Sequence, residues 1–198
     1  MAVAIAWKLM SVAPRADPPE RALLERCKAQ DPLAFRAFVV QHERMVFALL
    51  SRMLGHGGEV EDLAQETFVR AFRAFPSFDV DGNAKASTWL LTIATRLALD
   101  ARKRKHVASA SLEDTDETST GSNPELSLER RQLGHAIAAA AARLPDDQRA
   151  ALILADFHGL STAEIAAAIG VNESTAKTRL FRAREKMREA LKDEWRTS

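Results

Sequence analysis

Basic side chains recur along the last part of the sequence, where they could bind a polyanion. They follow one another every two or three residues, as Lys177, Arg179, Arg182, Arg184, Lys186 and Arg188. Ammonium and guanidinium groups donate hydrogen bonds to phosphate oxygens and to the edges of bases. The predicted chemistry is therefore recognition of a nucleic acid and not a covalent reaction.

Three short helices are expected to position these residues within 144–191. Ser161 and Glu164 stand three positions apart, which is the pattern of a capping box at the start of the middle helix. Gly170 can end that helix in the left-handed conformation, and Asn172 can cap the basic helix that follows. A short helix joined by a tight glycine turn to a basic helix predicts a helix-turn-helix, whose second helix enters the major groove.

An ordinary helical hairpin with a solvated basic face would give the same local pattern. Charge runs on helices are most often solvated surfaces, so this alternative stays open when the stretch is taken alone. The concentration of basic residues on the second helix favours a nucleic-acid partner.

Composition limits the other classes of function. The chain has 198 residues, of which 46% are hydrophobic and 28% charged, as in an ordinary globular protein. Cys27 is the only cysteine, which excludes an internal disulfide and favours a reducing cytoplasm. The histidines are scattered and no nucleophile–base pair is evident, so we expect no catalytic residue, no metal and no cofactor. No stretch reaches the roughly 18 apolar residues of a membrane span.

Three longer helices are expected in the first half of the chain. An Asp-Pro pair at residues 31–32 is a strong start signal for the first, which keeps one apolar face over about five turns. The second is expected over residues 60–75, with acidic and amide side chains on its outer face. We expect Ser87 or Thr88 to cap the third, which ends in a basic cluster at residues 102–106.

The composition changes abruptly between Val107 and Glu129. This stretch contains six carboxylates, many Ser and Thr residues, and no Lys or Arg. Such a segment cannot bury enough apolar surface to become ordered. The expected fold is therefore all-α, with two small helical domains and a flexible acidic linker. The expected divisions are a flexible tail at 1–19, a first helical domain at 20–106, the linker at 107–126, and a helix-turn-helix domain at 127–198.

Three motifs resemble bacterial sigma factors of the sigma-70 family, in particular the small extracytoplasmic-function (ECF) group. EDLAQETFVRAFRAF (61–75) is similar to the segment that binds the clamp helices of the RNA polymerase β′ subunit. STWLLTIATRLALDARKRK (87–105) is similar to the segment that opens and reads the −10 promoter element. LSTAEIAAAIGVNESTAKTRLFRAREKMREAL (160–191) is similar to the helix-turn-helix that reads the −35 element. The helix-turn-helix alone would also suit a response regulator, whereas all three motifs in this order are specific.

The resemblance implies a cytoplasmic protein that binds core RNA polymerase, through the β′ clamp helices and the β flap, and directs it to promoter DNA. It also implies control by an anti-sigma factor. The core-polymerase-binding residues implied are Glu61, Asp62, Gln65, Glu66 and Arg70. Those implied for −10 DNA are Asp81, Asn83, Lys85, Trp89, Arg96, Arg102, Arg104 and Lys105. Those implied for −35 DNA are Ser174, Thr175, Lys177, Thr178, Arg179, Phe181 and Arg182.

Two features of the −10 segment differ from what the resemblance leads one to expect. Arg96 stands where an asparagine is frequent in the group, so it adds positive charge near the expected path of single-stranded DNA. Only Phe78 and Trp89 supply aromatic rings there, and we therefore expect weak intrinsic melting. The main alternative function is a stand-alone helix-turn-helix regulator, which would leave the 61–75 and 102–106 segments unexplained. A helical enzyme is a third class, for which no acid–base constellation is found.

Overall fold

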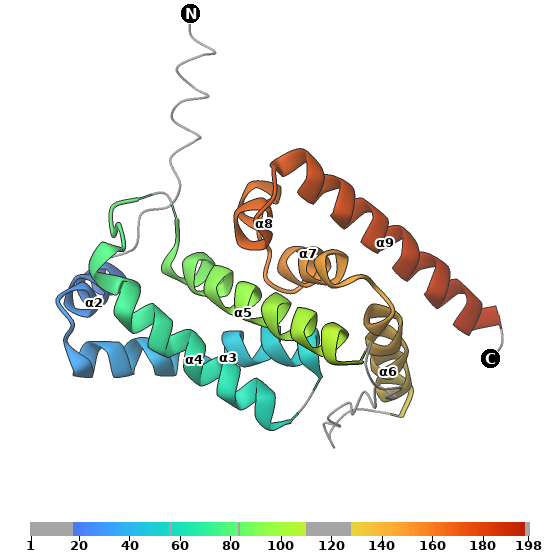
Figure 1. Ribbon diagram of the computed structural model, residues 1–198, viewed down its shortest axis with the longest axis horizontal. Coiled ribbons are helices and arrows are strands. Elements are labelled where there is room, and N and C mark those ends of the chain that lie inside the picture. The colour runs from blue at the N-terminus through green and yellow to red at the C-terminus, as the bar shows by residue number, and fades with distance from the viewer. Residues whose placement is uncertain (1–17, 56, 83, 110–127, 197–198) are drawn as a thin grey trace, which may run out of the picture.

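The computed structural model describes residues 18–55, 57–82, 84–109 and 128–196, and every regular element within these ranges is helical. The elements are α2 (Pro18–Lys28), α3 (Pro32–Leu54), α4 (Gly58–Ala74), the short 3₁₀ helix η1 (Phe75–Ser77), α5 (Ala86–Ser109), α6 (Leu128–Ala142), α7 (Asp146–Asp156), α8 (Thr162–Ile169) and α9 (Glu173–Arg196). The predicted all-α fold class is confirmed. Figure 1 shows α2–α5 as one region and α6–α9 as a second region beside it.

Helices α2 to α5 enclose an aromatic and aliphatic core. Phe38 and Phe75 are fully buried, with ring centroids 5.0 Å apart in an edge-to-face arrangement. Trp89 extends this cluster, because its ring lies 5.1 Å from Phe75 and 4.9 Å from Phe78. Such aromatic pairs contribute about 0.5–1.5 kcal/mol beyond the area they bury. The cluster holds the start of α5 against the end of α4, and it thereby positions the two ends of the loop between them.

The start of α3 follows the predicted Asp-Pro signal. The Asp31 carboxylate accepts hydrogen bonds from the backbone N–H groups of Leu33 and Ala34, at 2.9 and 3.3 Å, and Pro32 occupies the first turn. The Arg26 guanidinium donates to the other Asp31 oxygen at 2.6 Å. The hydrogen bonds from Arg26 and Ala34 hold the pKa of Asp31 below its ordinary value.

The second region contains the predicted helix-turn-helix in α8 and α9. The Ser161 hydroxyl accepts from the backbone of Glu164, and the Glu164 carboxylate accepts from the backbone of Ser161, so the capping box is complete. Gly170 ends α8 with φ of 72°, which a residue with a β-carbon rarely adopts. Asn172 accepts from the N–H of Thr175 at 2.8 Å and caps α9. All three local predictions are confirmed.

The two regions lie against each other and share one continuous hydrophobic core. Helix α7 packs on α3 and α5, and α8 packs on α5. Figure 1 shows α7 and α8 between α5 and α9, so that α9 lies on the outer side of the second region. This contact brings residues that the sequence assigns to two separate domains within hydrogen-bonding distance of one another.

Several boundaries differ from those predicted, and α4 spans Gly58–Ala74 where residues 60–75 were expected. Helix α5 begins at Ala86, so Ser87 and Thr88 lie inside its first turn and neither precedes the helix as a cap. The Thr88 hydroxyl instead donates to Glu164 in α8, at 3.1 Å, because the second region offers it a carboxylate. Residues 107–109 complete α5 and residues 18–19 begin α2. The remainder of the expected linker and tail lies outside the described residues, so their flexibility stays a prediction. None of the described helices combines the length and apolar character needed to cross a membrane.

Candidate nucleic-acid and polymerase interfaces

The first turns of α9 present the predicted −35 residues on an exposed face. One side of this helix is buried through Ala176, Leu180 and Ala183. On the opposite side Lys177 and Thr178 are exposed, and the Phe181 side chain is 66% exposed. Residues three or four apart share a helix face, so these three side chains form a continuous outer surface. An exposed phenyl ring between a cation and a hydroxyl suits contact with thymine methyl groups in a major groove.

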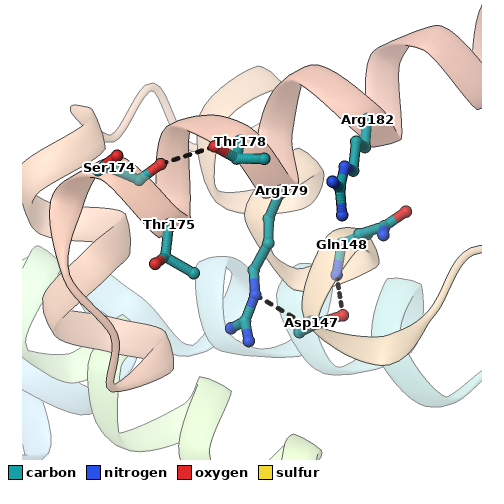
Figure 2. Close-up of a pocket in the computed structure, with 7 residues that line it drawn as sticks. All are labelled: Asp147, Gln148, Ser174, Thr175, Thr178, Arg179 and Arg182. Carbon is teal, nitrogen blue, oxygen red and sulfur yellow. Dashed lines mark hydrogen bonds and ion pairs between the residues drawn. The ribbon is translucent and has the colours of Figure 1, made fainter.

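A hollow of about 370 Å³ lies beside this surface, between the start of α7 and the first turns of α9 (Figure 2). It is lined by Asp147, Gln148, Ser174, Thr175, Thr178, Arg179 and Arg182. Five of these residues belong to the predicted −35 set, and most of the lining carries hydroxyl, amide or guanidinium donors. Asp147 is the one carboxylate in the lining, and its Oδ2 atom lies 2.8 Å from Nε of Arg179. The structure thus brings the −35 set together and pairs one of its cations internally.

The predicted −10 residues are spread along α5 and the loop before it. Trp89 is half-buried in the aromatic cluster, while Lys85 and Arg104 are exposed. Asp81 pairs with Arg21 at 2.6 Å, and Lys105 pairs with Glu59 at 2.6 Å. Asn83 lies outside the described residues.

Two arginines of the −10 set contact the second region. The Arg96 guanidinium donates to the backbone carbonyl of Ala167 in α8 at 3.0 Å. Arg102 forms an ion pair with Asp146 at the start of α7 and donates to the carbonyl of Met53 at 3.2 Å. In this arrangement the Arg102 side chain is largely covered, because α7 packs on α5 beside it, whereas Arg96 stays exposed. The groove expected for −10 DNA stays a prediction.

The residues predicted to bind polymerase lie on the outer face of α4. Glu61, Asp62, Gln65 and Arg70 are exposed, and Glu66 pairs with Arg70 at 2.6 Å, one helical turn away. The opposite face of α4 is buried through Val60, Leu63, Ala64, Thr67, Phe68 and Ala71. The core thus fixes the helix, and its polar face is available to a partner.

Both regions of the chain match family models of known proteins. Residues 38–107 match the family model for Sigma-70 region 2, and residues 134–187 match the model for Sigma-70, region 4. The ECF RNA polymerase sigma factor SigW of Bacillus subtilis is 34% identical over 86% of this chain and 95% of its own length. The chain belongs to the ECF group of the sigma-70 family. The ECF RNA polymerase sigma factor SigE of Mycolicibacterium smegmatis is 35% identical over 91% of this chain and 70% of its own length.

A solved structure supports the same family at the level of fold. The sigma factor RpoE in complex with the anti-sigma factor NepR, from Bartonella quintana, is 25% identical, with a TM-score of 0.66 over 80% of this chain and 96% of that one. The family matches and the named relatives show that this sigma factor directs RNA polymerase to promoters.

Sequence reasoning missed the buried arginine that joins the two regions of the sigma factor. Arg149 in α7 is 4% exposed; its Nη1 atom donates to the Met53 carbonyl at 3.0 Å and its Nε atom to the Ala141 carbonyl at 2.8 Å. Met53 lies in the last turn of α3, whose carbonyls have no partner within the helix. A cation there also interacts favourably with the helix dipole. The available signal was a charged residue at helical spacing from the apolar Leu152 and Ile153 of the same helix.

Glu164 has a second role beyond its capping box. Burial would raise the pKa of this carboxyl, but hydrogen bonds from Ser161 and Thr88, together with the charge of Lys85, outweigh it and leave the pKa below its ordinary value. Since Thr88 and Lys85 belong to the first region, the ionised carboxylate links the two regions as well as capping α8.

Three further titratable groups are buried or half-buried. Burial lowers the pKa of His42, whose ring lies 4.4 Å from that of Phe38. Burial and the charge of Arg52 lower the pKa of His158. Burial raises the pKa of the Cys27 thiol to about 11, so the thiol is neutral in the core of the first region. Across the described residues, no group of three or more His, Cys, Asp or Glu side chains is arranged to hold a metal ion.

Proposed function

We propose that this ECF sigma factor binds core polymerase through the outer face of α4, reads the −10 element with α5 and its preceding loop, and reads the −35 element with α9. The observation that carries the proposal is the exposed face formed by Lys177, Thr178 and Phe181 on the second helix of a complete helix-turn-helix. Such a helix can reach base edges in a major groove.

Within α9, side chains near the start and near the middle of the helix have different roles. Lys177 and Arg182 lie in the first turns, which enter the groove, and they read bases. Arg184 and Lys186 lie farther along and contribute charge; Arg184 also pairs with Asp156 at 2.5 Å. Contacts to phosphates supply affinity without sequence preference, whereas contacts to base edges supply the preference.

On the polymerase side, the acidic and amide groups of α4 are the docking surface. Glu61, Asp62 and Gln65 are all exposed near the start of a helix whose other face is buried. They are free to meet the β′ clamp helices, and the second region meets the β flap. The solved complex of a relative with an anti-sigma factor supports regulation of this chain by such a protein. The protein acts in the cytoplasm by binding alone, without a catalytic step.

Run-off transcription with purified core polymerase on genomic promoter fragments tests the function as a whole. The full chain should direct specific transcripts that core polymerase alone does not produce.

Asp62→Ala combined with Gln65→Ala should weaken core binding, with helical content and melting temperature nearly unchanged. Gln41→Ala combined with Glu43→Ala is a matched control, because both residues are exposed on α3. A stand-alone regulator would bind its DNA site but would not bind core polymerase selectively, and that outcome would overturn the proposal.

Gel-shift titrations test the division of labour on α9. Lys177→Ala should cost about 1–3 kcal/mol on the cognate −35 duplex and relax its preference at one or two positions. Lys186→Ala, the control on the same helix, should weaken binding to cognate and scrambled duplexes alike and reduce the salt dependence. If Lys177→Ala lowers both affinities by one factor, its role in reading bases is withdrawn.

A further inference from the structure

The first turn of α7 contacts both helices that are assigned to promoter DNA. Asp147 Oδ2 lies 2.8 Å from Nε of Arg179 on α9. Its neighbour Asp146 pairs with Arg102 on α5 and lies 3.0 Å from Nε2 of His106. Successive residues of a helix point about 100° apart, so adjacent carboxylates can face two different helices. Each helix assigned to DNA therefore has one arginine paired with an aspartate of the same short turn.

Both arginines belong to the sets that are expected to meet DNA, and their pairing uses the groups that a phosphate would need. A guanidinium binds a carboxylate and a phosphate through the same planar set of N–H donors. The side chains are only 14% exposed for Arg102 and 28% exposed for Arg179. While paired, each has its Nε–H directed at an aspartate and has little surface left for a second anion.

The hollow beside Asp147 shows where a phosphate could approach. Around it, Ser174, Thr175 and Thr178 supply hydroxyls and Arg182 supplies a second guanidinium (Figure 2). Asp147 is the one carboxylate among the lining residues. A surface with several hydrogen-bond donors and two positive charges, Arg179 and Arg182, attracts a phosphate, and the single negative charge of Asp147 opposes it at the position where Arg179 would bind.

The direct packing of the two regions also excludes simultaneous reading of both promoter elements. Their nominal positions differ by about 25 base pairs, or about 85 Å of duplex axis at 3.4 Å per pair. In the structure α5 and α8 are in direct contact, with Arg96 hydrogen-bonded to Ala167. The contact between Asp146 and Arg102, which joins the two regions, therefore belongs to the unbound protein and must break when the promoter is bound.

From these contacts we propose that Asp146 and Asp147 are internal counter-ions that compete with promoter phosphates for Arg102 and Arg179. The inference rests on the proposed function, because it takes both arginines as DNA contacts. Its consequence is that the free protein binds DNA less tightly than its basic helices would allow. Because the competition concerns phosphates, it lowers affinity for all sequences alike.

The first test measures binding of the full chain to −35 duplexes. Asp147→Asn, which keeps the shape and removes the charge, should tighten binding to cognate and scrambled duplexes by the same factor, about two- to fivefold, as expected for release of a partly exposed ion pair. The gain should shrink at higher salt, because screening weakens the internal pair. Glu25→Gln on α2 is the control for net charge and should leave both affinities unchanged.

A double-mutant cycle with Arg179→Ala makes the test specific. If Asp147 acts through Arg179, Asp147→Asn should have no effect in the Arg179→Ala background. Persistence of the gain there would reveal a general charge effect and overturn the proposal, as would unchanged or weaker binding by the single variant. If Arg179→Ala alone leaves DNA binding unchanged, the DNA role of Arg179 in the proposed function fails instead.

The second test applies the same cycle to Asp146, with a short single-stranded oligothymidine as the probe. Asp146→Asn should tighten binding about two- to fivefold, and Arg102→Ala should abolish this gain. Circular dichroism confirms that both variants remain helical, and Arg102→Gln replaces the alanine variant if that one does not fold. If Asp146→Asn leaves oligothymidine binding unchanged, Asp146 is a structural link between the regions and its part of the proposal is wrong.

Discussion

Replacement of the buried Arg149 by Met tests the contact between the two regions. Arg149→Met keeps a long, unbranched side chain but removes the hydrogen bonds to the carbonyls of Met53 and Ala141. Both carbonyls keep another donor in the variant. The Met53 carbonyl also accepts from the Arg102 guanidinium, and the Ala141 carbonyl also accepts from the backbone N–H of Leu144. The variant therefore loses these two bonds while both carbonyls keep a donor.

The magnitude follows from these contacts. Hydrogen bonds from a charged donor are worth about 1.5–3 kcal/mol each, so two of them give roughly 3–6 kcal/mol. Part of this is offset, because the variant no longer has to bury a guanidinium charge. We expect the free energy of unfolding to fall by about 2–3 kcal/mol, and the melting temperature by roughly 4–12 °C in a chain of this size.

Urea unfolding followed by circular dichroism measures this loss, and limited proteolysis between residues 110 and 127 reports whether the regions separate. Arg143→Met is the matched control, because Arg143 is exposed near the same end of α7. Its effect should stay within about 0.5 kcal/mol. Equal losses for Arg149→Met and Arg143→Met would refute the reasoning, since Arg149 would then contribute no more than a surface charge.

Three further predictions concern single groups. Ser161→Ala should lower the free energy of unfolding by about 1 kcal/mol through loss of the α8 cap. The lowered pKa of Glu164 stabilises the fold above that pKa, and this stabilisation is lost as the pH falls through the pKa. Ser161→Ala should make this loss at acid pH smaller, as measured by urea unfolding between pH 3 and 6. The lowered pKa of His42 means that the unfolded chain takes up the proton first, so stability should fall as pH drops below about 6.5, and His42→Leu should remove part of this slope. With its pKa raised to about 11 and its side chain fully buried, Cys27 should react with iodoacetamide at pH 8 roughly 100-fold or more slowly in the folded than in the urea-unfolded protein, and rapid labelling of the folded chain would contradict the structure.

The helix starts and ends that could be predicted are those whose signal is complete within a few residues. Asp31 before Pro32, Ser161 with Glu164, and Gly170 each satisfy backbone groups of their own turn. Such signals act over distances of three or four residues, so neither tertiary packing nor the rest of the chain is needed to read them. The cap predicted for α5 was wrong because its signal is not local. The hydroxyl of Thr88 has its partner, Glu164, 76 positions away in the sequence.

The candidate interfaces divide in the same way. Helical periodicity placed the acidic residues of α4 on an exposed face, and the family resemblance, together with helical spacing, placed Lys177, Thr178 and Phe181 on the exposed face of α9. Periodicity tells which face of a helix is buried, but it carries no information on which helix covers it.

The partners of Arg102, Arg149 and Arg179 were therefore decided only by the tertiary structure. Their contacts join residues 44, 96 and 32 positions apart, across helices whose mutual arrangement is set by the shared core. In the sequence, Asp146 and Asp147 are typical acids of a first helical turn, where they would favour the helix dipole in any fold. The sequence by itself determined the helices, their exposed faces and the family of this protein. Which charges meet one another depended on how the two regions pack, because an ion pair forms only where folding brings both groups within a few ångströms.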